Sequence, residues 1–147
     1  MIDPNLTRRA ARVVLLTPER EVLLMHIAFP FRAAPIWVAP GGGLERDETW
    51  EEAAARELHE ETGQRRTIGR LVFEQRFALP GGAQPRTQHE RFFLVETARF
   101  EPVARTLEGN ERAWFRGFGW WPLARLSSAP DVFSGAALAA AIERALV

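Results

Sequence analysis

The sequence predicts an α/β fold in which a mixed β-sheet lies between helices, an α/β/α sandwich formed as one domain over residues 1–147. Two apolar runs near the N-terminus are separated by a turn signal, a pattern typical of paired strands. A stretch of strong helix formers follows Thr49, and an alanine-rich stretch near the C-terminus repeats its apolar residues with helical spacing. Strands, helix, strands and helix in that order favour a sheet covered by helices on both faces.

The first elements are expected to be two strands, at residues 10–16 and 22–27, joined by the Thr17–Arg20 turn. His26 falls late in the second strand, where a partly buried position is expected rather than a ligand role. Residues 28–35 carry two prolines and are predicted to be irregular. Phe29 and Phe31 in this segment are candidate substrate-binding residues that could stack on a flat ring, with burial under the loop as the alternative.

A short strand at residues 36–39 leads into a glycine loop and then into the central helix. Thr49 followed three residues later by Glu52 is a capping-box signature, which places the helix start near Trp50. Gly63 provides a left-handed C-terminal stop.

The second half of the chain is predicted to add three strands and two helices. The expected ranges are strands at 67–79, 91–100 and 117–123, a short helix at 123–126 and a final helix at 136–146, capped by Asp131 or Ser134. His89 and Glu90 are expected at the surface, before the second of these strands. Leu138, Ile142 and Leu146 lie four apart and are expected to pack on the sheet.

Composition excludes several classes of function. The net charge is zero, with no basic stripe, so no nucleic-acid partner is expected. Cysteine is absent, which excludes disulfides and thiolate chemistry. All 19 cationic residues are arginine, so a phosphate loop of the type that needs lysine is excluded. No signal peptide or membrane-spanning apolar run is recognised, and a cytoplasmic location without membrane contact is the expectation.

Three acidic residues share one face of the central helix. Glu57, Glu60 and Glu61 are related by spacings of three and four, and like charges so placed oppose helix formation. Such a ridge is better explained by a divalent cation, because Mg²⁺ prefers oxygen ligands. The glycines before the helix let the Gly41 carbonyl approach the same point, and Glu48 could add a fourth carboxylate.

Residues 42–64 resemble the Nudix box, G-x5-E-x7-R-E-U-x-E-E-x-G-U, where U is a bulky aliphatic residue. Gly42, Glu48, the Arg56-Glu57-Leu58 triplet, the Glu60-Glu61 pair and Gly63 match it. Gln64 departs from the final aliphatic position, and Asp47 stands where family members often have glycine. Neither departure touches a carboxylate.

The resemblance implies a Nudix-type sandwich and Mg²⁺- or Mn²⁺-dependent hydrolysis of a nucleoside diphosphate linked to another group. Carried over by position, the metal ligands are the Gly41 carbonyl and the side chains of Glu48, Glu57, Glu60 and Glu61. The resemblance implies that Glu57 and Arg56 are catalytic residues, with Arg56 orienting a glutamate of the box. It also implies a general base. Glu111 is preferred as the base, with Glu108 or a glutamate of the box as alternatives.

Substrate identity is left open by the sequence. Pro80 lies where ADP-ribose pyrophosphatases of the family carry a proline, which makes it a candidate substrate-binding residue, although a turn explains it equally well. ADP-ribose, related dinucleotides and nucleoside triphosphates are all candidates, and the aromatic loops leave room for a homodimer. The alternative function is a catalytically silent, nucleotide-binding or regulatory module of the same fold. A silent module would be expected to have lost Glu57, Glu60 or Glu61, and all three are present.

Overall fold

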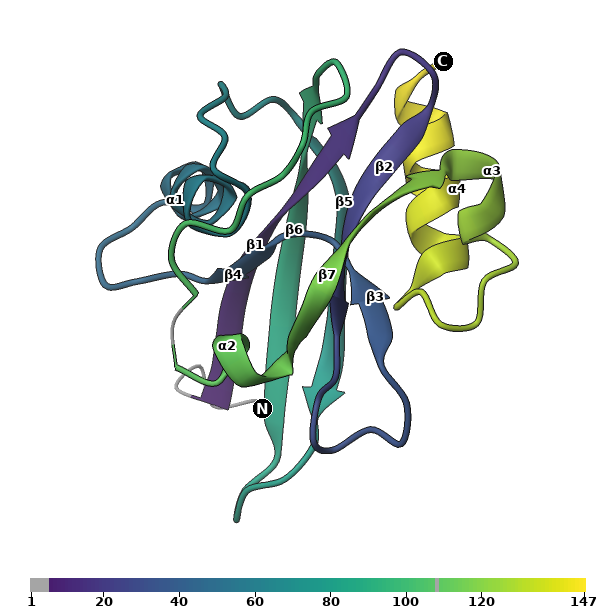
Figure 1. Cartoon of the computed structure of the whole chain (residues 1–147). Helices are drawn as coiled ribbons and strands as arrows, with labels where there is room; N and C mark the ends of the chain where they lie inside the picture. Colours follow the sequence, from purple (N-terminus) through teal and green to yellow (C-terminus); the bar gives the residue numbers. More distant parts are fainter. Residues whose placement is uncertain (1–5, 108) are drawn as a thin grey trace.

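The computed structural model describes residues 6–107 and 109–147, and over these residues it contains a seven-stranded sheet with helices on both faces (Figure 1). The strands are β1 (Thr7–Leu16), β2 (Glu21–Ile27), β3 (Ile36–Val38), β4 (Gly41–Gly43), β5 (Leu71–Leu79), β6 (Arg86–Glu96) and β7 (Phe115–Pro122). The helices are α1 (Trp50–Thr62), α2 (Glu111–Trp114), α3 (Leu123–Leu126) and α4 (Gly135–Ala145). The predicted α/β/α arrangement is confirmed.

The sheet is mixed because one strand pair is parallel. The main strand order is β3-β2-β1-β6-β5, with β4 paired to β1 and β7 paired to β2. Strands β1 and β6 run parallel from the Thr7–Thr87 pair to the Leu16–Glu96 pair, whereas the other pairs are antiparallel. The beginnings of β1 and β6 therefore lie side by side, next to the glycines of β4.

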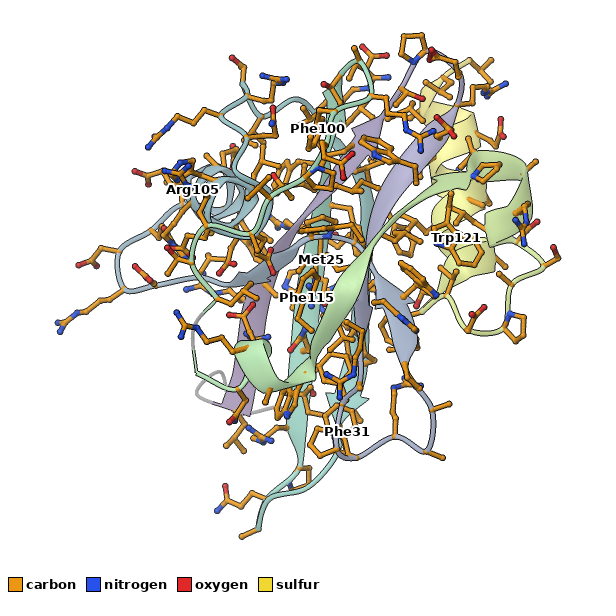
Figure 2. The ribbon with its side chains drawn as sticks, in the orientation of Figure 1. Met25, Phe31, Phe100, Arg105, Phe115 and Trp121 are labelled. Atoms are coloured by element: carbon orange, nitrogen blue, oxygen red, sulfur yellow. The ribbon has the colours of Figure 1, made fainter. Side chains whose placement is uncertain are left out.

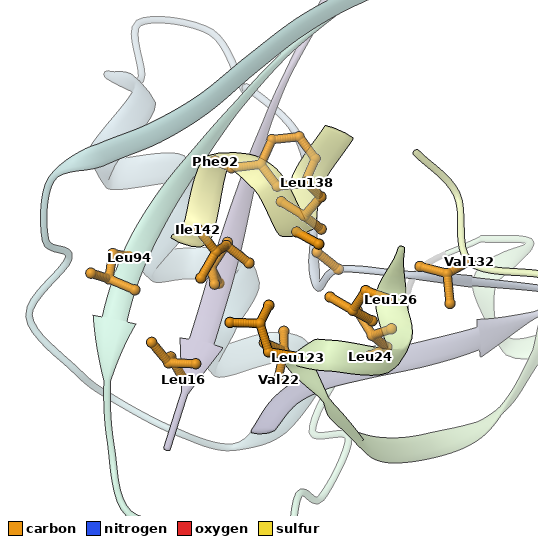
Figure 3. Packing of buried hydrophobic residues seen from close by; sticks show 13 residues of the cluster. Leu16, Val22, Leu24, Phe92, Leu94, Leu123, Leu126, Val132, Leu138 and Ile142 are labelled. Atoms are coloured by element: carbon orange, nitrogen blue, oxygen red, sulfur yellow. The ribbon is translucent and has the colours of Figure 1, made fainter. Parts of the chain in front are cut away.

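Alternation along β1 divides its side chains between two cores. Ala11, Val13 and Leu15 belong to the core that α1 covers. Val14 and Leu16 belong to the core that α3 and α4 cover on the opposite face (Figure 3). Because both faces of the strand are buried, its C-terminal half reads as a continuous apolar run.

Helix α1 has both predicted ends. The Thr49 hydroxyl accepts a hydrogen bond from the Glu52 backbone N–H (3.1 Å), and the Glu52 carboxylate accepts one from the Thr49 N–H (2.9 Å). Gly63 ends the helix with a φ of 81°. Asp47, at the position where glycine is common in the family, has a φ of 65°. Aspartate tolerates this left-handed conformation better than most residues, which explains how the loop accepts the departure.

Several other expectations from the sequence are also borne out. His26 is half-buried in β2 and stacks on Trp37, with ring centroids 4.3 Å apart. Leu138 and Ile142 of α4 are buried, and Leu146 packs against the same core. The expectation that the side chain of Asp131 or Ser134 caps α4 is wrong, because Ser134 is the residue before the helix and makes no side-chain capping bond. Its hydroxyl instead donates to Gln75 (2.8 Å).

The strand boundaries after α1 were less well predicted. Strand β5 begins at Leu71 rather than residue 67, and β6 begins at Arg86 rather than residue 91. The expectation that His89 and Glu90 lie at the surface is wrong, since they are 8% and 2% exposed within β6. These polar residues tolerate burial because other side chains satisfy them: Glu74 binds His89, and Arg12 binds Glu90.

No helix in the described part of the chain has both the length and the hydropathy that crossing a lipid bilayer requires.

Candidate active site

Three carboxylates from two separate parts of the chain meet beside the glycine loop. Glu57 and Glu61 come from α1, and Glu111 comes from the start of α2. One carboxylate oxygen from each lies within 4.8 Å of the other two. Glu57 and Glu61 are buried, and Glu111 is half-buried. The structure thus brings the preferred base candidate, Glu111, to the predicted metal ligands, across about 50 residues of sequence.

The glycine loop fits tightly against these carboxylates. The Gly41 N–H donates a hydrogen bond to Glu61 Oε1 at 2.6 Å. Gly41 has a φ of 145°, and a Cβ there would meet the Ala11 carbonyl oxygen at 2.1 Å. A Cβ on Gly42 would meet Glu57 Oε1 at 2.6 Å. Glycine is therefore required at Gly41 by its backbone conformation and the neighbouring backbone, whereas a larger residue at Gly42 would displace the Glu57 carboxylate.

Arg56 holds the acidic residues around it in place. Its Nε and Nη2 donate to the two carboxylate oxygens of Glu48 at 2.7 and 3.0 Å. Its Nη1 donates to Glu57 (3.0 Å) and Glu60 (3.3 Å), and Nη2 also donates to the Gly43 carbonyl. The hydrogen bonds from Arg56 lower the pKa of Glu48 below its ordinary value. Among the described residues, Glu48 and Glu60 contact Arg56 and lie outside the three-carboxylate group.

The two helix carboxylates repel each other in a buried setting. Burial, reinforced by the charges of Glu111 and Glu60 and opposed by Arg56, raises the pKa of Glu57 to about 7. Burial and the charge of Glu57 raise the pKa of Glu61 well above its ordinary value. A divalent cation would remove this penalty, because carboxylate oxygens are the ligands that Mg²⁺ and Mn²⁺ favour. The residues present therefore fit such an ion, with Glu57, Glu61 and Glu111 able to hold it.

A polar network that was not predicted from the sequence lies on the sheet beside the three carboxylates. Arg12 of β1 donates through Nε to Glu90 Oε2 of β6 at 2.9 Å. Arg8 Nη1 donates to Gln88 Oε1 at 2.8 Å, and Gln88 Nε2 donates to Glu90. The sequence feature that could have indicated this network is Arg12, a charged residue inside an apolar run. Its partner was not evident, because the sequence does not reveal that β1 and β6 are adjacent.

The carboxylates and the polar network line one cavity of about 770 Å³. All three carboxylates of the group contribute to its wall, as do Arg8 and Arg12. Aromatic residues from four parts of the chain form an aromatic wall of the same cavity: Phe29 and Phe31 of the 28–35 loop, Phe77 of β5, Trp114 of α2 and Phe133 of the segment before α4. A cavity lined by both carboxylates and aromatic rings suits a molecule that carries both phosphates and a flat ring.

The predicted substrate-binding residues all line this cavity. Phe29 and Phe31 stack with ring centroids 5.1 Å apart, and the Phe31 side chain is 56% exposed, so Phe31 is not buried under its loop. Pro80 reaches the same cavity from the turn after β5. Figure 2 shows Phe31 at the end of the sheet where the 28–35 loop lies, away from Trp121, which lies beside α3. Glu108 lies outside the described residues.

Comparison with known proteins supports the pattern seen in residues 42–64. Residues 6–141 match the model of the NUDIX domain. The human diphosphoinositol polyphosphate phosphohydrolase 3-alpha is 32% identical over 120 residues, which cover 78% of this chain and 67% of that protein.

Solved structures show the same fold. The NUDIX domain of NrtR from Shewanella oneidensis, solved with ADP ribose, aligns over 99% of this chain and 94% of its own, with a TM-score of 0.70 and 20% identity. The ORF135 protein of E. coli aligns over 94% of this chain and 89% of its own, with a TM-score of 0.69 and 22% identity. The Nudix box, the fold and the match to the NUDIX model agree. The chain therefore belongs to the NUDIX family, and it is a hydrolase that acts on phosphorus-containing acid anhydrides.

Proposed function

We propose that this protein is a metal-dependent hydrolase of the pyrophosphate bond in a nucleoside diphosphate linked to another group. The observation that carries the proposal is that Glu57, Glu61 and Glu111 form one close group and all line the cavity with the aromatic wall. A substrate bound in that cavity would place its phosphates at the carboxylates and its base among the aromatic rings.

The residues divide the work by position. Glu57 and Glu61 would hold a divalent cation, which would neutralise charge on the pyrophosphate oxygens and lower the pKa of the attacking water. Glu111, at the cavity wall, accepts one proton from the attacking water. The water oxygen bonds to one phosphorus, the bridging P–O bond breaks, and the two phosphate-bearing products leave. Arg56 fixes the Glu57 carboxylate, and the Gly41 N–H fixes that of Glu61.

Metal removal is the first test of this proposal. We expect a chelator to stop hydrolysis and added Mg²⁺ or Mn²⁺ to restore it, since without a cation three close carboxylates would repel the negatively charged pyrophosphate. Product release should be followed at fixed ionic strength, because free salt also screens the phosphates. Turnover that persists in chelator at the original rate would contradict the assigned role of the carboxylates.

A substrate screen tests the nucleotide part of the proposal. The human relative is named for diphosphoinositol polyphosphates, which lack a flat ring, whereas the aromatic wall of this cavity favours a nucleobase. We expect ADP-ribose, dinucleoside polyphosphates or nucleoside triphosphates to be hydrolysed with at least tenfold higher kcat/KM than a diphosphoinositol polyphosphate. The opposite preference would replace the substrate class and leave the hydrolase assignment intact. No turnover of any of them with Mg²⁺ or Mn²⁺ would favour the silent binding module.

Arg8 is proposed to bind a substrate phosphate. It lines the cavity, and within the described part of the chain its guanidinium makes one hydrogen bond, to the neutral Gln88, and no ion pair. Burial and the neighbouring Arg12 lower its pKa. An anionic phosphate would relieve both effects.

We expect Arg8→Ala to lower kcat/KM about 10- to 100-fold, mainly through KM, which is the value of one hydrogen bond to a charged group. Arg9→Ala is the matched control, because Arg9 is the next residue of β1 and does not line the cavity. Steady-state kinetics on both variants give the result. Equal KM values for the two variants would remove Arg8 from the site.

A further inference from the structure

A buried ion pair lies directly beneath the glycine loop. Arg12 and Glu90 are 2.9 Å apart, and their side chains are 16% and 2% exposed. Both oxygens of the Glu90 carboxylate accept hydrogen bonds. Oε2 accepts from Arg12 and from Gln88, and Oε1 accepts from Gln75 at 2.8 Å. Donors from β1, β5 and β6 thus fix the orientation of this carboxylate, which in turn fixes the Arg12 guanidinium.

The other side of the guanidinium contacts the backbone of the loop. Arg12 Nη1 donates to the Gly41 carbonyl at 3.1 Å and to the Ala39 carbonyl at 3.2 Å. The N–H of the same Gly41 donates to Glu61 Oε1 at 2.6 Å. An unbroken chain of contacts therefore runs from Glu90 through Arg12 and Gly41 to one carboxylate of the acidic group.

The loop needs such an external anchor. Residues 41–43 are three consecutive glycines, which carry no side chains and have the widest conformational freedom of any residue. Pairing with β1 sets the path of this segment, and Arg12 bonds the carbonyls on either side of Pro40. The Gly41 residue that must present its N–H to Glu61 is thereby held on its carbonyl side as well.

Stability alone does not account for a charged pair at this place. Burying two ions costs several kcal/mol of desolvation each, and well-packed apolar residues often serve stability equally well. A guanidinium offers what an apolar residue lacks, namely several donors in a rigid fork that can bind a carboxylate and two carbonyls at once. Its charge also attracts the neighbouring Glu61 carboxylate.

We propose that Arg12, oriented by Glu90, is a positioning residue that fixes the Gly41 peptide and through it the Glu61 carboxylate in the arrangement that binds the divalent cation. This inference rests on the proposed metal-dependent function. Arg12 itself need not touch the substrate, and its effect is expected in the affinity for the metal before it is seen in the affinity for the substrate.

The test compares Arg12→Met, Arg12→Lys and Glu90→Gln with the wild-type protein. Titration with Mn²⁺ alone gives the metal affinity, thermal unfolding gives stability, and kcat is measured as a function of Mn²⁺ concentration. We expect the affinity for Mn²⁺ to fall about 10- to 100-fold in Arg12→Met, the usual effect of losing a group that orients a ligand. Lysine keeps the charge but cannot hold Glu90 and both carbonyls, so Arg12→Lys should also lose affinity while retaining the fold.

The matched control is Arg91→Met. Arg91 is the residue after Glu90 on β6, and its Nε donates to Glu74 at 2.7 Å, in an ion pair that does not reach the acidic group. This variant should keep the wild-type affinity for Mn²⁺ whatever it does to the melting temperature. A loss of kcat in the Arg12 variants that saturating Mn²⁺ reverses would support positioning.

Two results would overturn different claims. Folded Arg12→Lys and Glu90→Gln variants that bind Mn²⁺ as tightly as the wild-type protein would show that the ion pair is only structural, even if Arg12→Met fails to fold. If instead the wild-type protein and a Glu61→Gln variant bind Mn²⁺ equally, the acidic group is not the metal site. The proposed function would then fail together with this inference.

Discussion

Replacing Glu57 by glutamine is expected to abolish hydrolysis and to stabilise the metal-free protein at neutral pH. Glu57 belongs to the close carboxylate group, and losing its charge should cost at least about 10²-fold in kcat/KM, as losses of one preorganised electrostatic contact do. The fold should persist, since glutamate and glutamine have similar helix propensities and the Gln side chain can still accept the hydrogen bond from Arg56.

The gain in stability follows from the raised pKa. Burial raises the pKa of Glu57 from 4.5 to about 7. Between these two pH values the folded, metal-free protein retains a proton that the unfolded chain has released, so its free energy of unfolding falls as the pH rises through this interval and levels off above it. Glutamine does not titrate, and the part of the decline due to Glu57 should disappear.

Urea unfolding of the metal-free proteins between pH 4.5 and 8 measures this effect. At pH 8 the Glu57→Gln variant should exceed the wild-type protein by on the order of 3 kcal/mol, the free energy that corresponds to a rise in pKa from 4.5 to about 7. Some decline should remain, because the pKa of Glu61 is raised as well. Glu51→Gln, an exposed change on the same helix, is the control and should alter neither slope nor activity. A less stable Glu57→Gln variant at pH 8 would contradict the electrostatic description of the site.

The central helix and its acids could be predicted because their signals are local. The capping box, Gly63 and the spacing of Glu57 and Glu61 all lie within one short stretch, and backbone hydrogen bonding and helical periodicity determine what such a stretch does. The apolar strands were predicted for the same reason.

The polar part of the site could not be predicted because its contacts are distant in sequence. Arg12 and Glu90 meet only because β1 and β6 are parallel neighbours, which no local pattern encodes. The start of β6 is polar and resembles a loop, so Glu90 was assigned to the surface. Glu90 can be buried because Arg12, Gln75 and Gln88 donate hydrogen bonds to its carboxylate. Arg12 and Gln75 lie near Glu90 only because β1 and β5 are the neighbours of β6 in the sheet.

The role of Glu111 could be predicted from the sequence only in part. A glutamate late in the chain was expected near the box, but the residues before the last strand offered two candidates. The structure places Glu111 at the start of a short helix, within 4.8 Å of Glu57 and Glu61. That distance suits a base that reaches the attacking water, and it also suits a third ligand to the cation.

Changing Glu111 to glutamine is expected to lower kcat about 10²- to 10⁴-fold, the usual contribution of a general base. Glu101→Gln, an exposed change in the preceding loop, is the control, and Glu108→Gln tests the second candidate. If Glu111 is the base, the loss should persist at saturating Mn²⁺.

A ligand role for Glu111 would give a different result. Glutamine would then weaken Mn²⁺ binding, and kcat would recover at high metal concentration. Measuring kcat against Mn²⁺ concentration therefore separates the two roles, because a filled metal site restores kcat only where Glu111 serves as a ligand. Unchanged kcat in Glu111→Gln with a large loss in Glu108→Gln would transfer the role of base to Glu108.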